Sequence, residues 1–529
     1  MSAQPVPVYP EKIDAAVLKV AGVVVLGAIM SILDITVVNV ALPTFQTKLS
    51  SSGTPIAYST VAWTVTGYTL ALATVIPLTG WAADRFGPKR LYMAALALFT
   101  LGSALCATAG SIGVLIGFRV LQGFGGGMLM PLGMTIMTRA AGPKRMGRLM
   151  AILGIPMLLG PIFGPILGGW LIDTASWHWI FLINLPIGLI ALGYAAWALS
   201  GDRPEPSESF DWLGMFLMSP GLAMFLYGVS SIPGAGSFLN WKTEVFGTVG
   251  VLMIIAFVLH SFRPAHPLLD LRLFKNRNLT AATATMFIFA GAFFGGLLLI
   301  PTYYQTVRGE LPVDAGWLVA PQGFGAMLTM PIAGALVDRF PVGRIVPFGL
   351  VLIIGGMFAL TQITATTSYW GYLIPVLFVM GLGMGGTMMP IMTSALKTLN
   401  HHQVARGSTL LNITQQIASS VGVATMSVIL TNGFKNSSLV QAGQALQANP
   451  DAAKDPGIAA LLQQYGNGFG AAVKEAMAQA FAHTYWVAAF LVMLTLIPAF
   501  FLPRQHEESH LLDDEEGTGE AELTPVIVH

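Results

Sequence analysis

The chain has 529 residues, of which 54% are hydrophobic and only 10% are charged, and its net charge is +1. An ordinary soluble domain contains about 25% charged residues, so this chain has too few charges to surround its apolar residues with a polar surface. A soluble protein is therefore excluded, and we expect the lipid bilayer to be its solvent. The balanced charge gives no reason to expect a nucleic-acid partner. The single cysteine, Cys106, excludes an intrachain disulfide or a cysteine metal cluster.

Apolar runs of about 20 residues, the length that crosses a bilayer as a helix, recur along the whole chain. The polar leader 1–16 runs into the first of them, which is too long for the apolar core of a signal peptide and has no small-residue cleavage site. We predict an all-α integral membrane protein with fourteen spans, near 17–43, 59–83, 91–110, 113–137, 147–173, 179–200, 212–231, 243–262, 279–302, 314–336, 344–364, 371–396, 404–432 and 480–502.

Lys and Arg are distributed unevenly between the two sets of loops. Of the 26 in the chain, 19 lie in the termini and even-numbered loops and six in the odd-numbered loops, while Arg119 lies inside a span. An even number of spans places both termini on one side, and an excess of Lys and Arg marks the cytoplasmic side. We therefore expect a multi-pass protein of the cytoplasmic membrane with both termini in the cytoplasm.

A short segment occurs twice, as GWAADRFGPKR at 80–90 after the second span and as GALVDRFPVGR at 334–344 after the tenth. Related halves are typical of secondary transporters. If the seventh and eighth spans are an inserted pair, the two copies occupy equivalent places in two six-helix halves. The predicted division is 1–200 for the N-terminal half, 201–278 for the linker with the inserted pair, 279–503 for the C-terminal half with an outer loop at 433–479, and 504–529 for an acidic, disordered tail.

Two charged residues lie deep inside predicted spans. Asp34 lies about 14 Å from the outer end of the first span, and Arg119 about 10 Å from the outer end of the fourth, at ~1.5 Å per residue. An ionised carboxylate at such a depth costs about 2.5–3.5 kcal/mol, so Asp34 must face a cavity or a partner. We predict that Asp34 carries a proton and that its contact with Arg119 couples proton release to movement. A permanent ion pair or a hydrogen bond to a neighbouring helix is the structural alternative.

Five motifs together resemble the major facilitator superfamily, and within it the fourteen-span drug:proton antiporter branch of the EmrB/QacA type. They are LDITVVNVALP at 33–43, the 80–90 loop, RVLQG at 119–123 followed by three glycines, the glycine- and proline-rich segment 154–169, and WHWIFLINLPIG at 177–188. The second loop copy departs from the pattern, because Pro341 replaces the glycine found at Gly87 and its basic end is reduced to Arg344.

The resemblance implies a major facilitator fold and an exporter that exchanges amphiphilic drugs or other small molecules for protons. It implies a cytoplasmic latch that favours the outward-open state, formed by Gly80, Asp84, Arg85, Gly87, Lys89 and Arg90, with Asp338 and Arg339 in the second copy. It also implies an antiporter motif that seals the interface between the halves, formed by Gly160, Pro161, Gly164, Pro165, Gly168 and Gly169. The glycines that recur every fourth residue in this span permit close approach of another helix, and ordinary helix packing is the alternative explanation for them.

Polar and aromatic residues in or near the spans are candidates for a substrate cavity. They are Asn39, Trp63, Tyr68, Gln122, Gln305, Asn412 and Gln415. The abundant Met and Phe suit an adaptable apolar pocket, although in a membrane chain such residues more often face lipid or the core.

Other functions remain as alternatives. Within transport, the exported substrate is alternatively an endogenous lipid, siderophore or metabolite. A membrane-embedded enzyme would need a convergent polar cluster or metal ligands, which the sequence does not suggest, so we expect neither an enzyme nor a metal site. The sequence contains no nucleotide-binding loop. We therefore expect no cofactor, and a proton gradient as the energy source.

Overall fold

The computed structural model of the chain describes residues 13–50, 56, 58–141, 145–201, 209–235, 237–400 and 403–505. The N-terminal part contains α1 (Ala15–Lys48), α2 (Tyr58–Val61), α3 (Trp63–Phe86), α4 (Pro88–Ala107), α5 (Ile112–Ala141), α6 (Met146–Thr174), α7 (Trp179–Leu182) and α8 (Asn184–Ala198). The middle contains α9 (Trp212–Ser230), α10 (Ile232–Ala235), η1 (Thr243–Gly247) and α11 (Thr248–Ser261).

The C-terminal part begins with η2 (Leu271–Lys275), α12 (Arg277–Leu297), α13 (Leu299–Tyr303), η3 (Tyr304–Arg308), α14 (Pro312–Val337) and α15 (Val342–Leu360). It continues with η4 (Tyr369–Leu373), α16 (Ile374–Gly385), α17 (Met388–Lys397), α18 (Val404–Lys435), α19 (Ser438–Ala448), η5 (Pro450–Lys454), α20 (Pro456–Tyr465), η6 (Gly466–Gly468), α21 (Phe469–Leu494) and α22 (Leu496–Ala499).

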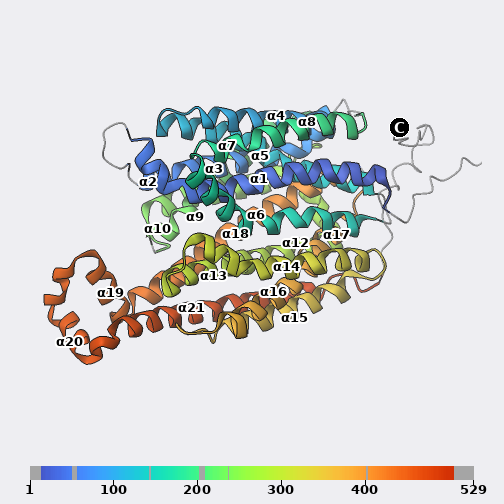
Figure 1. Cartoon of the computed structure of the whole chain (residues 1–529). Helices are drawn as coiled ribbons and strands as arrows, with labels where there is room; N and C mark the ends of the chain where they lie inside the picture. The colour runs from blue at the N-terminus through green and yellow to red at the C-terminus, as the bar shows by residue number, and fades with distance from the viewer. Residues whose placement is uncertain are drawn as a thin grey trace, which may run out of the picture.

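The helices form two packed groups (Figure 1). The N-terminal group, blue to green, packs α3 and α4 on α5 and packs α1 on α6 and α8. The C-terminal group, yellow to red, packs α14 on α16, α12 on α18 and α15 on α21. The groups meet where α6 contacts α14 and where α18 contacts α3 and α5. We call these two groups the N-terminal half and the C-terminal half.

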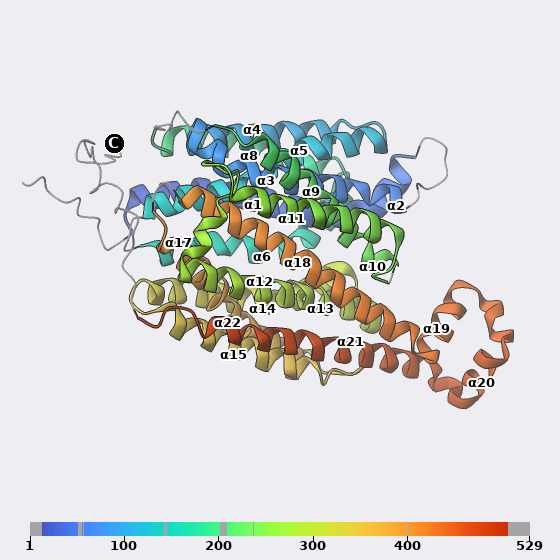
Figure 2. The ribbon, with the colours of Figure 1, turned by 180° about the vertical axis from the view of Figure 1, so that it is seen from behind.

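Helices α9 and α11, the inserted pair, pack against each other and close one side of the seam between the halves (Figure 2). Helix α9 contacts α3 of the N-terminal half and α18 of the C-terminal half. At its start, the carboxylate of Asp211 caps the Gly214 N–H at 2.8 Å and accepts a hydrogen bond of 2.8 Å from Nε2 of His260 in α11. Although burial opposes it, these contacts hold the pKa of Asp211 below its ordinary value.

Twelve helical segments of the described residues are long and apolar enough to cross a membrane, two fewer than predicted. The fifth and tenth predicted spans correspond to α6 and α14, which are absent from the twelve but contain 29 and 26 residues. At ~1.5 Å per residue each exceeds the ~30 Å hydrocarbon core of a bilayer. They also lie side by side within the bundle. The count of twelve is set by length and composition among the described residues alone.

The segment 433–479, predicted as an outer loop, contains short helices between α18 and α21. Helix α18 continues to Lys435, α21 begins at Phe469, and α19 and α20 lie between them as a lobe beyond the bundle (Figure 1). Ala and Gln favour helix. Ser437 and Asp455 cap α19 and α20 with their side chains. The lobe defines one end of the bundle, which we call the lobe end.

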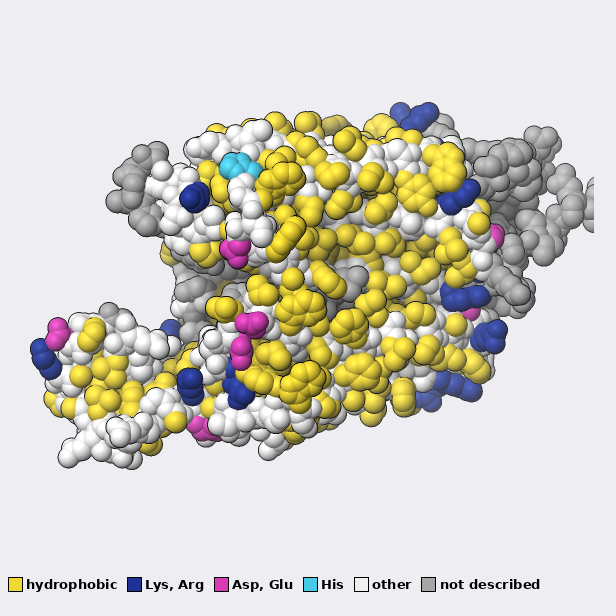
Figure 3. Space-filling model, viewed as in Figure 1, with side chains coloured by type: hydrophobic (Ala, Val, Ile, Leu, Met, Phe, Trp, Pro, Cys, Tyr) yellow, Lys and Arg dark blue, Asp and Glu magenta, His cyan; other side chains and the backbone are white. Residues whose placement is uncertain are grey.

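The start of α1 and helix α22 lie at the opposite end, which we call the terminal end (Figures 1 and 2). Apolar side chains cover the middle of the visible face, whereas most charged side chains lie toward the two ends (Figure 3). Such an apolar belt suits a bilayer rather than water. The predicted acidic tail lies outside the described residues from 506 onward.

Candidate functional site

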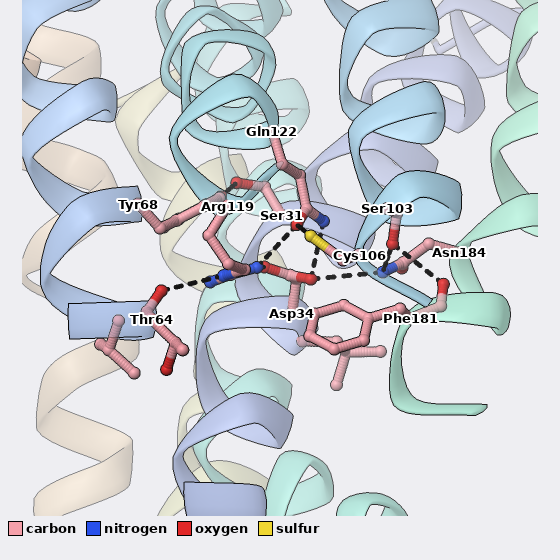
Figure 4. Close-up of polar contacts among 12 residues, drawn as sticks. Ser31, Asp34, Thr64, Tyr68, Ser103, Cys106, Arg119, Gln122, Phe181 and Asn184 are labelled. Carbon is pink, nitrogen blue, oxygen red and sulfur yellow. Dashed lines mark hydrogen bonds and ion pairs between the residues drawn. The ribbon is translucent and has the colours of Figure 1, made fainter. Parts of the chain in front are cut away.

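Asp34 and Arg119 form an ion pair in the interior of the N-terminal half (Figure 4). Nη1 of Arg119 in α5 lies 2.5 Å from Oδ2 of Asp34 in α1, and both side chains are fully buried. Removing two charges from water costs several kcal/mol per ion, which the attraction offsets only when the remaining polar atoms are also satisfied. The surroundings of the pair therefore determine whether it is stable.

Neutral amides from two helices complete the coordination of the carboxylate (Figure 4). Nε2 of Gln122 donates to Oδ1 of Asp34 at 2.8 Å, and the Oε1 of Gln122 accepts from Nη1 of Arg119 at 2.8 Å. Nδ2 of Asn184 at the start of α8 lies 3.4 Å from the same Oδ1 and donates to Oγ of Ser103 at 3.1 Å. The carboxylate of Asp34 is thus surrounded by donors from α5 and α8.

The guanidinium of Arg119 has further contacts on the α3 side. Its Nε donates to the carbonyl of Thr64 at 3.0 Å, and its Cζ lies 4.1 Å from the centre of the Tyr68 ring. The Tyr68 hydroxyl lies 3.3 Å from Oγ of Ser31. Nη2 of Arg119 has no hydrogen-bond partner among the described residues. The site therefore joins α1, α3, α5 and α8 around the buried carboxylate of Asp34.

The two repeated loops place their aspartates in contacts between the halves at the terminal end. Asp84 lies 3.5 Å from Arg139 of α5 and 3.7 Å from Arg406 of α18. Asp338 lies 2.8 Å from Nε of Arg148 in α6 and accepts a hydrogen bond of 2.8 Å from the backbone N–H of Gly147. The halves are therefore held together at this end from both loops.

Sequence comparison places these features in a known group. The sequence profile of the Major Facilitator Superfamily matches residues 24–423. The chain belongs to the Major Facilitator Superfamily. Membership of this transporter group confirms the prediction that the protein is a membrane transporter and not an enzyme.

Relatives within the superfamily cover most of the chain. It is 48% identical over 507 residues to a "Multidrug resistance protein B homolog" of Mycobacterium tuberculosis, covering 95% of this chain and 93% of the relative. It is 32% identical over 413 residues to a "Putative multidrug resistance protein MdtD" of Escherichia coli, covering 77% and 85%.

Two solved structures share the fold. The human organic anion transporter MFSD10 has a TM-score of 0.56 at 15% identity, with coverage of 90% of this chain and 99% of that chain. The proton:xylose symporter XylE has the same TM-score at 14% identity, with coverage of 95% and 99%. At these identities the likeness concerns the fold alone.

Other predicted latch residues lie at the end of α3 and the start of α4. Gly87 ends α3 with a φ of 87°, a conformation that glycine adopts without strain, and Pro88 begins α4. Lys89 donates through Nζ to the carbonyls of Ala196 and Leu199 at the end of α8, at 3.0 and 2.5 Å. Arg85, Arg90 and Arg339 are exposed.

Gly80 lies where the two halves meet. A Cβ at Gly80 would lie 3.3 Å from Thr409 of α18, so this glycine allows close contact between the halves. The basic partners Arg139, Arg148 and Arg406 were missed as latch residues.

We expect Asp338→Asn to open the terminal end more often, because it removes an ion pair between the halves. A partly exposed pair of this kind contributes about 1 kcal/mol, equivalent to about a five-fold change in population. Ser408 is buried and its hydroxyl lies 2.9 Å from that of Thr135, where α18 of the C-terminal half contacts α5 of the N-terminal half. The rate at which a maleimide labels Ser408→Cys, in a Cys106→Ser background, measures the opening. Asp314→Asn, an exposed acid at the other end of α14, is the matched control, and equal rates in both variants would contradict a latch at Asp338.

The small-residue stripe of α6 faces its own half rather than the opposite one. A Cβ at Gly164 would collide with Thr36 of α1, one at Gly160 would collide with Ile32, and one at Gly168 would lie 3.2 Å from Val37. Gly169 faces α14, where a Cβ would lie 3.3 Å from Val313. The side chains of Pro161 and Pro165 lie outside the described part of the chain. Of these four glycines, Gly169 lies at the contact between the halves, where a seal was expected. The other three pack α6 against α1, the helix that carries Asp34.

We expect Gly164→Leu to impair transport while the protein stays in the membrane, because the added side chain pushes α6 away from α1. Overpacking of this kind costs about 1–3 kcal/mol. Gly193→Leu on α8 is the matched control, since a Cβ there meets no atom within 4 Å among the described residues. Efflux rate at equal protein level is the measurement, and efflux equal to that of the control would show that the α1–α6 contact is not needed.

The predicted cavity residues do not form one cluster. Tyr68 and Gln122 belong to the Asp34 site. Trp63, 38% exposed, lies with its ring centre 5.3 Å from that of Tyr227 in the inserted pair. Asn412 donates to Sδ of Met134 at 3.2 Å, where α18 meets α5. Asn39 and Gln305 are exposed and Gln415 is half-buried. Ser103 and Asn184 were not predicted as site residues, although Asn184 lies within one of the motifs quoted above. Cys106 was not predicted either, and its Sγ lies 3.6 Å from Oε1 of Gln122.

Proposed function

We propose that the protein is a proton-coupled antiporter of the EmrB/QacA type that exports amphiphilic small molecules, including drugs, across the cytoplasmic membrane. The buried Asp34–Arg119 pair is the observation that carries this proposal. A transporter needs no fully buried charge for stability, since apolar replacements of such pairs are often neutral or stabilising. Ionisable groups inside membrane proteins are commonly proton sites. The names of the relatives support drugs as substrates.

The proposal includes fourteen spans, with α6 and α14 added to the twelve candidates, and cytoplasmic termini. Supporting this orientation, the loops at 80–90 and 334–344, rich in Lys and Arg, lie at the terminal end. The domains would then be 1–200, 201–278, 279–503 and 504–529, with the lobe outside the cell. The latch contacts would close the cytoplasmic side, as in an outward-facing or occluded state.

In the proposed cycle, a proton from outside neutralises Asp34 and weakens its bond to Arg119. The N-terminal half then rearranges because α1, α3, α5 and α8 lose their shared charge contact, and the latch on the cytoplasmic side opens. Loss of the proton to the cytoplasm restores the ion pair, substrate binds, and the latch closes again. One proton moves inward for each return of the site to its paired state.

Transport by the purified chain in proteoliposomes tests the proposal. A neutral fluorescent amphiphile is present at the same concentration inside and outside the vesicles, and its movement is followed with and without an imposed pH gradient. We expect movement against the concentration gradient only when the pH gradient is present, and its loss on addition of a protonophore. Concentrative movement that needs no pH gradient would contradict proton coupling.

A further inference from the structure

A cavity of about 450 Å³ lies in the lobe-end half of the molecule, between the inserted pair and the C-terminal half. Its walls come from α9 and α10, from α12 and α13, and from α18, and they include Ser230, Pro233, Phe294, Leu298, Ser420 and Ala424. Figure 2 shows α10 and α13 on opposite sides of α18 in this region. We call this space the lateral cavity. It is separate from the Asp34 site, which lies within the N-terminal half.

Small side chains on α18 create the lateral cavity. Ser419, Ser420 and Ala424 face it where larger residues would fill the space. Next to it, α12 and α18 touch backbone to backbone, since a Cβ at Gly422 would collide with the carbonyl of Gly291. On the other side, Val229 and Ile232 pack against Ala424 and Val428. Both boundaries are close-packed, so the cavity is preformed.

The chemistry of the lining defines the ligand. Its eleven side chains include no Asp, Glu, Lys, Arg or His, and the polar ones are the hydroxyls of Ser230, Ser419 and Ser420. Ser230 donates to the Tyr227 carbonyl at 2.9 Å and Ser419 to the Gln416 carbonyl at 3.2 Å, which leaves both oxygens as acceptors. Ser420 is half-buried on the same wall. A charged group would be costly here, whereas a hydrocarbon chain with one hydroxyl or similar neutral group fits.

Its position favours access from the bilayer. Leu298 on the rim is 45% exposed on the apolar outer surface. Helix α18 forms one wall of the cavity, and the same helix also contacts α3 and α5 in the seam between the halves. It therefore links the lateral cavity to this seam. A volume of about 450 Å³ lies within the range of small-molecule sites, about 300–1,000 Å³.

We propose that the lateral cavity binds an uncharged single-chain amphiphile that enters sideways from the lobe-end half of the bilayer. The role of the lateral cavity as a substrate site rests on the proposed function. It narrows the exported substrates to those whose apolar chain carries a neutral polar group. Binding itself needs neither the proton gradient nor Asp34.

Photolabelling of the full chain in phosphatidylcholine proteoliposomes tests this proposal. The probe is hexadecanol with a diazirine on its chain, and labelled peptides are mapped by mass spectrometry. We expect saturable labelling of the segments 294–301 and 419–424, which unlabelled hexadecanol suppresses and hexadecyltrimethylammonium does not. Labelling that does not saturate, or that is spread equally over the exposed faces of α11 and α15, would overturn the proposal.

Two neighbouring positions on α18 give a matched pair of variants. Ser420→Trp fills the cavity, whereas Val421→Trp adds the same side chain at a 37% exposed position outside the lining. We expect Ser420→Trp to lower labelling about ten-fold, equivalent to about 1.4 kcal/mol, and Val421→Trp to leave it unchanged. Equal labelling in the two would overturn the proposal. If Ser420→Trp does not fold, Ser420→Ala is expected to lower the preference for hexadecanol over hexadecane, and an unchanged preference would overturn the proposal.

Labelling and transport separate the two proposals. Saturable labelling in a protein that shows no gradient-driven transport would leave the lateral cavity standing and remove the antiporter function. Gradient-driven transport of a dye with no saturable labelling would remove the lateral cavity alone.

Discussion

Asp34→Asn is expected to abolish efflux driven by a pH gradient, because asparagine keeps the size and hydrogen-bonding shape of the side chain but cannot bind and release a proton. The same change leaves Arg119 buried without its counter-ion, and breaking a buried pair typically costs about 3–5 kcal/mol. The hydrogen bonds from Arg119 to Gln122 and Thr64 remain, so we expect a folded protein with a lower melting temperature. Efflux from proteoliposomes and thermal unfolding in detergent are the two measurements.

The double variant Asp34→Asn/Arg119→Gln is the control for stability. It removes both charges, so the melting temperature should recover toward that of the unchanged protein while efflux remains absent. Recovery of efflux together with stability would show that the loss in Asp34→Asn came from misfolding. Full active transport by Asp34→Asn alone would remove Asp34 from the mechanism.

The sequence was sufficient to bring Asp34 and Arg119 together because their depths follow from counting residues along apolar helices. The depth of Asn184 follows in the same way. Its contact with Asp34, however, depends on which side of α8 faces α1, and the sequence of a uniformly apolar helix does not indicate that side. In a bilayer the lipid-facing and buried sides of a helix are both apolar. This is why the candidate cavity residues were scattered in the structure.

Contacts between segments far apart in the chain were equally hidden. Asp84 and Arg406 approach each other only because α3 packs on α18, and Arg148 meets Asp338 only because α6 packs on α14. The every-fourth-residue glycines predicted a close helix contact but not its partner, which is α1. The composition of 433–479 suggested a loop because its helices are polar and lie beyond the bundle. Helices in such a position have no long apolar run that would reveal them in the sequence.

Arg119→Ala is expected to move the pH of half-maximal efflux upward. Removal of the guanidinium leaves the carboxylate of Asp34 without its cation, so the neutral protonated form is favoured and higher pH is needed to remove the proton. If turnover requires that removal, the profile should shift by about one to three pH units, the usual influence of a neighbouring Arg on a carboxylate.

Arg119→Lys separates charge from geometry. The guanidinium uses Nη1 for Asp34 and Gln122 and Nε for the Thr64 carbonyl, and a lysine cannot reproduce this planar set of donors. We therefore expect a smaller upward shift than in Arg119→Ala. The measurement is the pH profile of efflux for the unchanged protein and both variants, with Asp34→Asn as the background. Because Asp34 and Arg119 are in direct contact, the effects of changing them should not add. Identical pH profiles in all active variants would instead show that Arg119 has only a structural role.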